Sequence, residues 1–341
     1  MAVIAPASMG GVLNINKEAN WTSFDVVSVV RRLLKIRRVG HCGTLDPFAT
    51  GVLPIFVGRS TGLVRFTENY DKRYRVTYAI GRATETEDLT GATCGGRTPN
   101  SAEIAALQAD DWAVLRRHVA ALVGQQDQIP PMYSAVKVGG RKLYEYARKG
   151  ETVLRPVRRI EVYEAKFVSA QVVRDAAPVR LTIDIHCSKG TYVRTLGSDI
   201  GQRLGWGAHA VALTRTACGF YNLADSIMLS ELEAWLARQP EEFRLAINGQ
   251  IPQIEGSPFF APESALRDLT VIKLNANESR RLLQGQTLRL SADGVEYKSG
   301  MRLCTYGPHG FLGVARCKQV YPDGIIISAE RMLANLDDYQ S

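Results

Sequence analysis

The spacing of apolar residues in the first part of the chain predicts both helices and strands. A helix is expected to begin at Ser23, which can cap it, because apolar residues follow at helical spacing. These residues are Val26, Val27, Val30, Leu33 and Leu34. The alternation in YRVTYAI (74–80) predicts a strand, and further strands are expected at 157–169 and 179–187.

Four later segments combine helical spacing with residues that start or end helices. Asp110 or Asp111 can start a helix that runs through Val123 and ends at Gly124. The segment 133–143 predicts a strand, a glycine turn and the start of a helix closed by Gly150. Gly190 and Thr191 open a third helix, whose apolar residues are Val193, Leu196, Ile200 and Leu204. A capping box of Ser230 and Glu233 predicts the start of a fourth helix.

The order of these elements favours the α+β class, because strands and helices do not alternate as in a parallel βαβ fold. Residues 239–267 are rich in Pro, Gly and Ser and indicate a connection. A short helix, NESRRLLQ, and strand-like runs follow it. The runs lie near 286–290, 301–305, 311–318 and 324–328, and they predict a small, mostly β second domain.

Composition places the chain among ordinary globular proteins, since its 341 residues are 45% hydrophobic and 22% charged. No apolar run is long enough for a membrane span and no signal peptide is evident, so we expect a cytoplasmic protein without membrane contact. The six cysteines form no C-x-x-C pair and are interpreted as reduced thiols. The five histidines show no metal-ligand spacing, and no phosphate-binding glycine motif indicates a nucleotide cofactor.

Positive charge changes this picture by indicating a polyanionic partner. The formal net charge is +8, and basic residues cluster at 31–38, 140–150 and 155–159, with tyrosines interleaved in the second cluster. Each cluster alone is typical of a solvated surface. Together the three clusters make a nucleic-acid-binding groove as plausible as three ordinary solvated surfaces.

A single carboxylate stands out in GHCGTLDPFATGVLPI (40–55), where Asp46 is the only acidic residue. An aspartate before proline often opens a turn, which is the structural alternative. The segment also contains Gly40, Gly43 and Gly51 but no base, so an ionised Asp46 needs a distant partner. Arg194, in the first turn of the helix after Gly190, is the best candidate, and it would hold the acid ionised and oriented.

The same segment resembles the catalytic motif of the TruB family of pseudouridine synthases, which isomerise the T-loop uridine at tRNA position 55. Other blocks resemble that family in the same order, so the similarity spans nearly all of residues 11–221. These blocks are NINKEANWTSFDVV (14–27), DKRYRVTYAIGRATETEDLTG (71–91), IPPMYSAVKVGGRKLYEYARKGE (129–151), CSKGTYVRTLGSDIG (187–201) and LTRTACGFY (213–221).

The resemblance implies a catalytic domain over 11–238, built on a mixed, mainly antiparallel sheet with flanking helices. After the connection it implies a PUA-like domain over 268–335, a small β-barrel-like module that binds RNA. The partner would be the T arm of tRNA, and neither a cofactor nor a metal would be needed. Agreement with the bacterial stand-alone form argues against a guide RNA, and a monomer is expected.

The resemblance also implies roles for individual residues. Asp46 matches the essential aspartate, which attacks either the ribose or the base. Tyr74 matches the tyrosine that stacks on the base and helps remove the C5 proton, and Arg194 the arginine paired with the aspartate. The expected substrate-binding positions are His41, which fills the space left by the flipped base, Lys17, Asp88, Tyr192 and the pocket residue Leu213. Each has a plain structural alternative, such as a turn residue for Asp88 or a core residue for Leu213.

Two other classes of function remain open at this point. An RNA-binding protein that helps tRNA fold would not need Asp46, so replacing Asp46 by Asn would leave its activity intact. A hydrolase with Asp46 as nucleophile would ordinarily call for a second carboxylic acid or a metal, and the sequence offers no good candidate for either.

Overall fold

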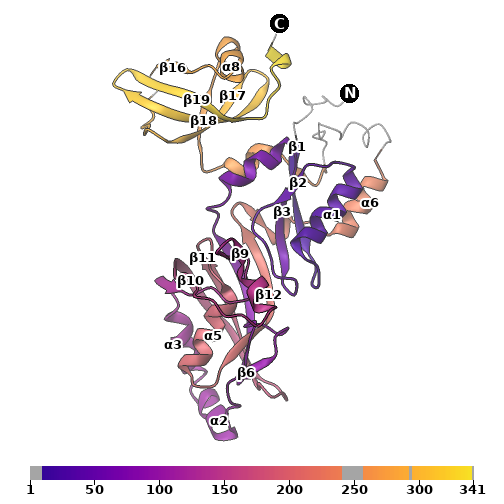
Figure 1. Ribbon diagram of the computed structural model, residues 1–341, viewed down its shortest axis with the longest axis vertical. Helices are drawn as coiled ribbons and strands as arrows, with labels where there is room; N and C mark the ends of the chain where they lie inside the picture. The colour runs from indigo at the N-terminus through magenta and orange to yellow at the C-terminus, as the bar shows by residue number, and fades with distance from the viewer. Residues whose placement is uncertain (1–9, 240–255, 292–293, 340–341) are drawn as a thin grey trace.

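The computed structural model describes residues 10–239, 256–291 and 294–339. Within these ranges the chain forms one large sheet and, at the other end of the molecule, a smaller C-terminal sheet (Figure 1). The large sheet has the order β14-β1-β3-β12-β4-β11-β10-β7, with β2 added to β3 and β13 added to β12. All its pairings are antiparallel except that of β12 with β3. The sheet is therefore mixed and mainly antiparallel, as the resemblance implied.

The strands of the large sheet come from most of the chain. They are β1 (Gly10–Lys17), β2 (Val39–His41), β3 (Thr50–Gly58), β4 (Lys72–Ile80), β7 (Gly124–Gln128), β10 (Arg158–Val172), β11 (Val179–Cys187), β12 (Ala208–Cys218), β13 (Tyr221–Asn222) and β14 (Phe259–Phe260). Two short hairpins lie off this sheet, β5 (Ala83–Thr84) with β6 (Thr93–Gly95) and β8 (Lys137–Val138) with β9 (Arg141–Lys142). The α+β class follows from this arrangement together with the helices.

The helices flank the large sheet. They are α1 (Ser23–Leu34), α2 (Ser101–Ala109), α3 (Ala113–Ala120), α4 (Leu143–Ala147), α5 (Val193–Arg203) and α6 (Leu229–Ala237), with 3-10 turns η1 (Arg59–Phe66), η2 (Leu223–Asp225) and η3 (Pro262–Leu266). None of the helices in the described ranges is both long and apolar enough to cross a bilayer.

Helix α5 packs closely on strand β4, and this contact positions the candidate site. Val76, Tyr78 and Ile80 of β4 are fully buried, as the alternating pattern predicted. A Cβ on Gly197 of α5 would lie 2.1 Å from the ring of Tyr78, so only glycine permits this approach. The Tyr78 hydroxyl donates to the carbonyl oxygen of Val193 over 2.7 Å, which fixes the first turn of α5 against β4.

The C-terminal sheet has the order β15-β17-β18-β19-β16, and only the pairing of β15 with β17 is parallel. Its strands are β15 (Thr270–Lys273), β16 (Leu288–Ser291), β17 (Arg302–Gly307), β18 (Gly310–Tyr321) and β19 (Gly324–Met332), and it carries helix α8 (Ala276–Leu283) and the turn η4 (Asp337–Tyr339). The expected short helix and four expected strands are present, and β15 was not anticipated.

Apolar side chains join the two parts of the molecule. Val12, Phe56 and Leu63 of the N-terminal part share one buried cluster with Val314 and Leu333 of the C-terminal part. Strand β14 and turn η3 fall in the segment expected to be a connection. Strand β14 pairs with β1, and side chains of β14 and η3 pack in the same cluster. Within that segment, residues 240–255 lie outside the described residues.

Several predicted helix boundaries were wrong. The helix expected from Asp110 or Asp111 to Val123 is α3, which spans only Ala113–Ala120. Asp111 and Trp112 have positive φ angles of 44° and 60°, which separate α3 from the unexpected α2, and Gly124 begins strand β7.

The two other boundary errors concern helix caps. The Thr22 hydroxyl, rather than that of Ser23, accepts from the N–H of Asp25 at the start of α1. Helix α6 begins at Leu229, because the Glu231 carboxylate accepts from the N–H of Met228, so the box of Ser230 and Glu233 does not form.

Candidate active site

The loop between β2 and β3 presents Asp46 and is tied down on both sides of that residue. The hydroxyl of Ser23, at the start of α1, accepts from the N–H of Leu45 over 2.9 Å. The carbonyl oxygen of Pro47 accepts from the N–H of Asn20 over 2.8 Å and from Nζ of Lys17 over 3.1 Å. The backbone that carries Asp46 is therefore held by β1, by α1 and by the turn between them.

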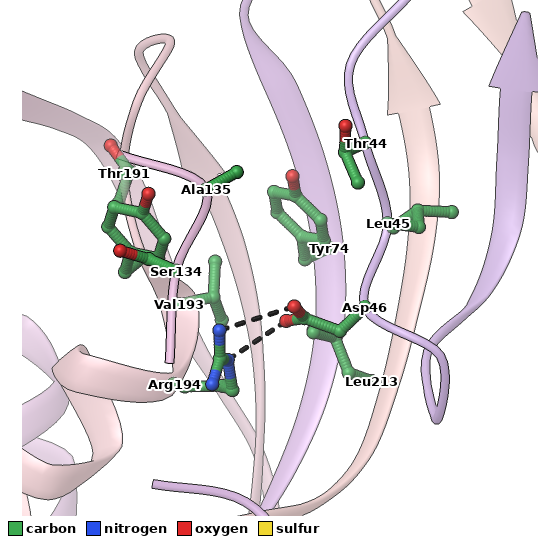
Figure 2. A pocket seen from close by; sticks show the side chains of 11 residues that line it. Thr44, Leu45, Asp46, Tyr74, Ser134, Ala135, Thr191, Val193, Arg194 and Leu213 are labelled. Atoms are coloured by element: carbon green, nitrogen blue, oxygen red, sulfur yellow. Dashed lines mark hydrogen bonds and ion pairs between the residues drawn. The ribbon is translucent and has the colours of Figure 1, made fainter. Parts of the chain in front are cut away.

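Arg194 lies in the first turn of α5 and forms a two-point ion pair with Asp46 (Figure 2). Its Nε lies 2.9 Å from Oδ2 of Asp46, and one terminal nitrogen lies 3.2 Å from Oδ1. The same terminal nitrogen donates to the carbonyl oxygen of Tyr133 over 3.0 Å, and the other donates to that of Thr86 over 2.6 Å. The pairing expected from the sequence is present, and the planar guanidinium is held from three separate segments.

Asp88 supports this arginine from behind. Its Oδ2 lies 3.3 Å from a terminal nitrogen of Arg194. Its Oδ1 accepts from the hydroxyl of Thr86 over 2.7 Å and from the N–H of Thr90 over 2.9 Å. The side chain is almost completely buried. Asp88 therefore orients Arg194, and it does not line the cavity beside the ion pair.

A cavity of about 160 Å³ opens beside the ion pair. This volume is small for a drug-sized ligand and suits one planar base. Figure 2 shows Asp46 and Arg194 pointing toward one another at this cavity, one from the loop and one from the helix. The lining residues are Thr44, Leu45, Asp46, Tyr74, Ser134, Ala135, Thr191, Tyr192, Val193, Arg194 and Leu213.

Tyr74, on β4, is the aromatic side chain next to the carboxylate in this cavity. Arg215 lies beside its hydroxyl and is itself only 1% exposed. Arg215 donates to the carbonyl oxygens of Val52 over 2.7 Å and Gly43 over 2.8 Å. Burial raises the pKa of Tyr74 well above its ordinary value, although the nearby Arg215 cation acts in the opposite direction. The tyrosine is therefore neutral at physiological pH.

Burial dominates the electrostatics of Asp46 as well. It raises the pKa of this carboxyl above the ordinary value, while the charge and hydrogen bonds of Arg194 oppose the shift and the charge of Asp88 adds to it. From the sequence we had expected only that Arg194 would lower the pKa of Asp46. The upward direction of the pKa shift follows mainly from the removal of this carboxyl from bulk water, and the second carboxylate, that of Asp88, adds to it.

Lys17 is a buried cation without a carboxylate partner in the described residues. Its Nζ donates to the carbonyl oxygens of Glu18, Trp21 and Pro47, and the residue is 1% exposed. Burial lowers the pKa of this lysine to about 8, against a smaller raising effect of the Asp46 charge. Lys17 therefore holds the loop rather than lining the cavity.

Two comparisons with known proteins identify the family. Residues 31–193 match the family described as "TruB family pseudouridylate synthase (N terminal domain)", and residues 194–251 match "tRNA pseudouridylate synthase B C-terminal domain". A protein called tRNA pseudouridine synthase B from Halalkalibacterium halodurans is 36% identical over 328 residues, which cover 96% of this chain and 98% of the relative. This chain belongs to the TruB family.

Other TruB relatives are similar in sequence to shorter parts of this chain. The protein of the same description from Geobacillus thermodenitrificans is 40% identical, covering 83% of this chain and 87% of the relative. The one from Lactococcus lactis is 41% identical, covering 80% and 76%. The fold of this TruB member also resembles a chain in the crystal structure of a Cbf5-Nop10-Gar1 complex, with a TM-score of 0.69, 21% identity and coverage of 98% and 88%.

The structure gathers five of the eight expected TruB site residues around the cavity. Asp46, Tyr74, Tyr192, Arg194 and Leu213 line it, whereas Lys17 and Asp88 lie behind it. His41, at the end of β2, is also outside the lining. Burial lowers the pKa of His41, and its Nδ1 is buried without a hydrogen-bond partner in the described residues, so the imidazole is neutral.

Several cavity residues of this TruB member had no assigned role in the sequence. Ser134 lies in the segment that supplies the Tyr133 carbonyl to Arg194, and its hydroxyl is buried with no partner in the described residues. The side-chain amide of Gln128 pins the backbone of Tyr192 by two hydrogen bonds, of 2.8 and 3.1 Å. The block 129–151 was similar to the family, but nothing in its residue pattern indicated which members would reach the cavity.

Proposed function

We propose that this protein isomerises the uridine at position 55 in the T loop of tRNA to pseudouridine, with Asp46 as the nucleophile. The observation that carries the proposal is the two-point ion pair of Asp46 with Arg194 at the wall of a base-sized cavity. The description of the relatives as tRNA pseudouridine synthase B supports the choice of a tRNA uridine.

A uridine inside a folded loop must leave its stack before its glycosidic bond becomes accessible. The cavity beside Tyr74 receives the flipped base, and the ring of Tyr74 provides a face for stacking. His41 lies on β2, next to the loop that carries Asp46, and would fill the space that the base leaves in the RNA. Tyr192 and Leu213 line the same cavity and would confine the uracil.

The chemistry needs neither an oxidant nor a second substrate. The carboxylate of Asp46 attacks C1′ of the ribose or the base itself, and the bond from N1 to C1′ breaks. A half-turn of the uracil about the axis through N3 and C6 exchanges N1 and C5. C5 then bonds to C1′, and the covalent bond to Asp46 breaks, which restores the free carboxylate. The C5 proton then leaves and N1 gains one, which makes the overall reaction an isomerisation.

The surroundings of Asp46 suit this chemistry. Arg194 orients the carboxylate from the first turn of α5, where the helix dipole also favours a negative charge. The Tyr74 hydroxyl lies next to the Arg215 cation and would assist removal of the C5 proton. The walls of this cavity would keep the detached uracil close to the ribose.

The remaining parts of the proposal concern partners and domains. Residues 11–238 form the catalytic domain, and 268–335 form a PUA-like domain that contacts RNA. The protein acts as a monomer in the cytoplasm on the T arm of tRNA, without a guide RNA. Elution at the mass of one chain in size-exclusion chromatography would support the monomer, and elution at twice that mass would contradict it.

The test uses the purified protein alone with an unmodified tRNA transcript that carries tritium at C5 of its uridines. Release of tritium to water is expected, and it is expected to disappear when the T-loop uridine is replaced by cytidine. Release that persists after this replacement would contradict the target position. Release only after a second RNA is added would contradict the absence of a guide RNA.

A further inference from the structure

Three arginines surround one carboxylate where the C-terminal sheet meets turn η1. Glu330 of β19 accepts two hydrogen bonds of 2.9 Å from Arg316, and its Oε1 lies 3.3 Å from Nε of Arg302. Arg65 of η1 lies 3.9 Å from the same carboxylate and donates to the carbonyl oxygen of Glu330 over 3.0 Å. Since one carboxylate balances one cation, this group retains an excess of two positive charges.

An aromatic ring holds two of these arginines in place. The guanidinium carbons of Arg65 and Arg302 lie 4.7 and 4.8 Å from the ring centroid of Phe66. Arg65 and Phe66 belong to η1, whereas Arg302 begins β17, so the stacking joins the two parts of the molecule. We call Arg65, Phe66, Arg302, Arg316 and Glu330 the junction cluster. A stacked guanidinium is pre-organised to offer its in-plane N–H donors to an anion.

Donors in the junction cluster remain without protein partners in the described residues. Arg302 uses only its Nε, on Glu330, and its two terminal nitrogens have no acceptor. Arg65 uses one terminal nitrogen. The side chains of Arg65, Arg302 and Arg316 are 51%, 37% and 36% exposed, so an anion can reach them from solvent.

A hollow of about 470 Å³ lies beside these donors. Arg302 and Arg316 line it together with Thr270 and Gly300, and Asp268 contributes one negative charge. This hollow is separate from the catalytic cavity, with which it shares no lining residue.

Joining the two parts of the molecule does not by itself require this many arginines. The junction already has the shared apolar cluster around Val12, Phe56 and Val314 and a hydrogen bond from Arg59 to the carbonyl oxygen of Ala334. Like charges held together around one carboxylate repel one another. A second anion would relieve this repulsion and use the free donors.

We propose that the junction cluster binds a backbone phosphate of the same RNA whose target base enters the catalytic cavity. Strand β3 runs from the Asp46 loop to η1, and its nine residues span about 27 Å. The contacted phosphate thus belongs to a helical stem some distance from the flipped base. This inference rests on the proposed function for the identity of the RNA.

The test measures RNA binding as a function of salt concentration, because each phosphate contact releases counterions. An Asp46→Asn background prevents turnover, and Arg302→Gln is compared with Arg289→Gln. Arg289 is a matched control on β16, 63% exposed and paired with Asp323 over 2.8 Å. The ligands are a full-length tRNA transcript and a hairpin shortened to the T loop and its closing base pairs.

With full-length tRNA, Arg302→Gln is expected to reduce the slope of log affinity against log salt by about 0.7 to 0.9. The affinity difference from the parent then shrinks about threefold between 50 and 200 mM salt. Arg289→Gln is expected to keep the parent slope, and with the short hairpin every variant is expected to match the parent. Arg302→Lys keeps a positive charge and is expected to keep most of the slope.

An unchanged slope in Arg302→Gln with full-length tRNA would overturn the inference, even if affinity fell. A purely structural role would weaken binding equally at all salt concentrations. If Arg302→Gln does not fold, Arg65→Gln makes the same test from the other side of Phe66. Stabilisation of the parent by inorganic phosphate, with no slope change on RNA, would instead indicate a small-anion site and would also overturn it. Absence of tritium release by the unaltered protein would contradict the proposed function separately.

Discussion

The Nε atom of Arg194 lies 2.9 Å from Oδ2 of Asp46, while another nitrogen of the same guanidinium lies 3.3 Å from Oδ2 of Asp88. One cation thus serves two carboxylates, only one of which faces the cavity. Asp88 is held by the hydroxyl of Thr86 and the backbone of Thr90, so it fixes the plane of the arginine. Arg194 in turn fixes the carboxylate of Asp46.

Replacement of Arg194 by lysine should show that stability and turnover depend on the planar guanidinium as well as on its charge. A single ammonium cannot bridge Asp46, Asp88 and the two backbone carbonyls, which leaves buried polar groups unpaired. We expect Arg194→Lys to lower the free energy of unfolding by about 3 kcal/mol and to reduce turnover severely. Denaturant unfolding and tritium release measure the two effects.

Arg75→Lys is the matched control for that substitution. Arg75 also forms a two-point pair, with Asp184 at 2.7 and 2.8 Å, but both side chains are exposed. Its loss should change the free energy of unfolding by less than about 1 kcal/mol. Equal effects of the two substitutions would contradict the role assigned to Arg194.

The pH dependence of turnover should have an acid limb from Asp46 and an alkaline limb from Lys17. The reaction needs the carboxylate of Asp46, whose pKa burial raises, so activity should fall with decreasing pH while the solution is still above the ordinary carboxyl range. Lys17 has a pKa of about 8, and its deprotonation removes a positive charge near Asp46. Activity should therefore also fall above about pH 8.

The contribution of Lys17 to the free energy of unfolding should increase with pH, whereas activity should decrease. Between about pH 8 and its ordinary value of 10.5, the unfolded chain binds the proton that the folded chain has lost. The contribution of this group to the free energy of unfolding therefore increases with pH over that range. Loss of activity above pH 8 should thus occur without unfolding caused by this group. An alkaline limb that persists unchanged in Lys17→Arg, which stays protonated, would rule out Lys17 as its source.

Gly51 should tolerate no side chain. Its φ is +99°, and a Cβ there would lie 2.2 Å from the carbonyl oxygen of Arg215 on the neighbouring strand β12. We expect Gly51→Ala to lower the free energy of unfolding by about 3 kcal/mol and to reduce turnover, because the Asp46 loop precedes this strand directly. Gly205→Ala isolates the cost of a positive φ, since Gly205 has φ +73° and open space around it. It should cost about 1 kcal/mol, and similar costs for both variants would contradict the predicted collision.

Tyr74→Phe separates stacking from proton transfer. The phenylalanine ring keeps the face on which a base can stack, so RNA binding should be unchanged. Loss of the hydroxyl beside Arg215 should lower turnover about a hundredfold if it assists removal of the C5 proton. Tyr74→Leu should in addition weaken binding by about 1 to 3 kcal/mol. Full turnover by Tyr74→Phe in single-turnover assays would exclude the hydroxyl from the reaction.

Local patterns predicted those strands that have one buried face. Strand β4 alternates cleanly because Val76 and Tyr78 face the core while Arg73 and Arg75 face solvent. Strand β3 was not predicted, because nearly all of TGVLPIFVG is buried and a continuous apolar run does not show which element it forms. Helix α2 was missed for the opposite reason, since only Leu107 among its residues is buried.

The candidate site was predictable in part. An acidic residue in an apolar segment without a base required a distant partner, and this argument correctly paired Asp46 with Arg194. The position of Asp88 behind the arginine depends on how the segment after β5 packs against α5, which no local spacing encodes. The buried hydroxyl of Ser134 and the carbonyl of Tyr133 reach the site for the same non-local reason.

The role of Asp46 is tested by comparing the unaltered protein with Asp46→Asn in the tritium-release assay on a tRNA transcript, with RNA affinity measured in parallel. The substitution removes the charge and the nucleophile but hardly changes the volume. If Asp46 is the nucleophile, the unaltered protein will release tritium and Asp46→Asn will release none, while both bind RNA with similar affinity. Normal release by Asp46→Asn would contradict the assignment of Asp46 as nucleophile, and RNA binding without release by either protein would favour a role in tRNA folding.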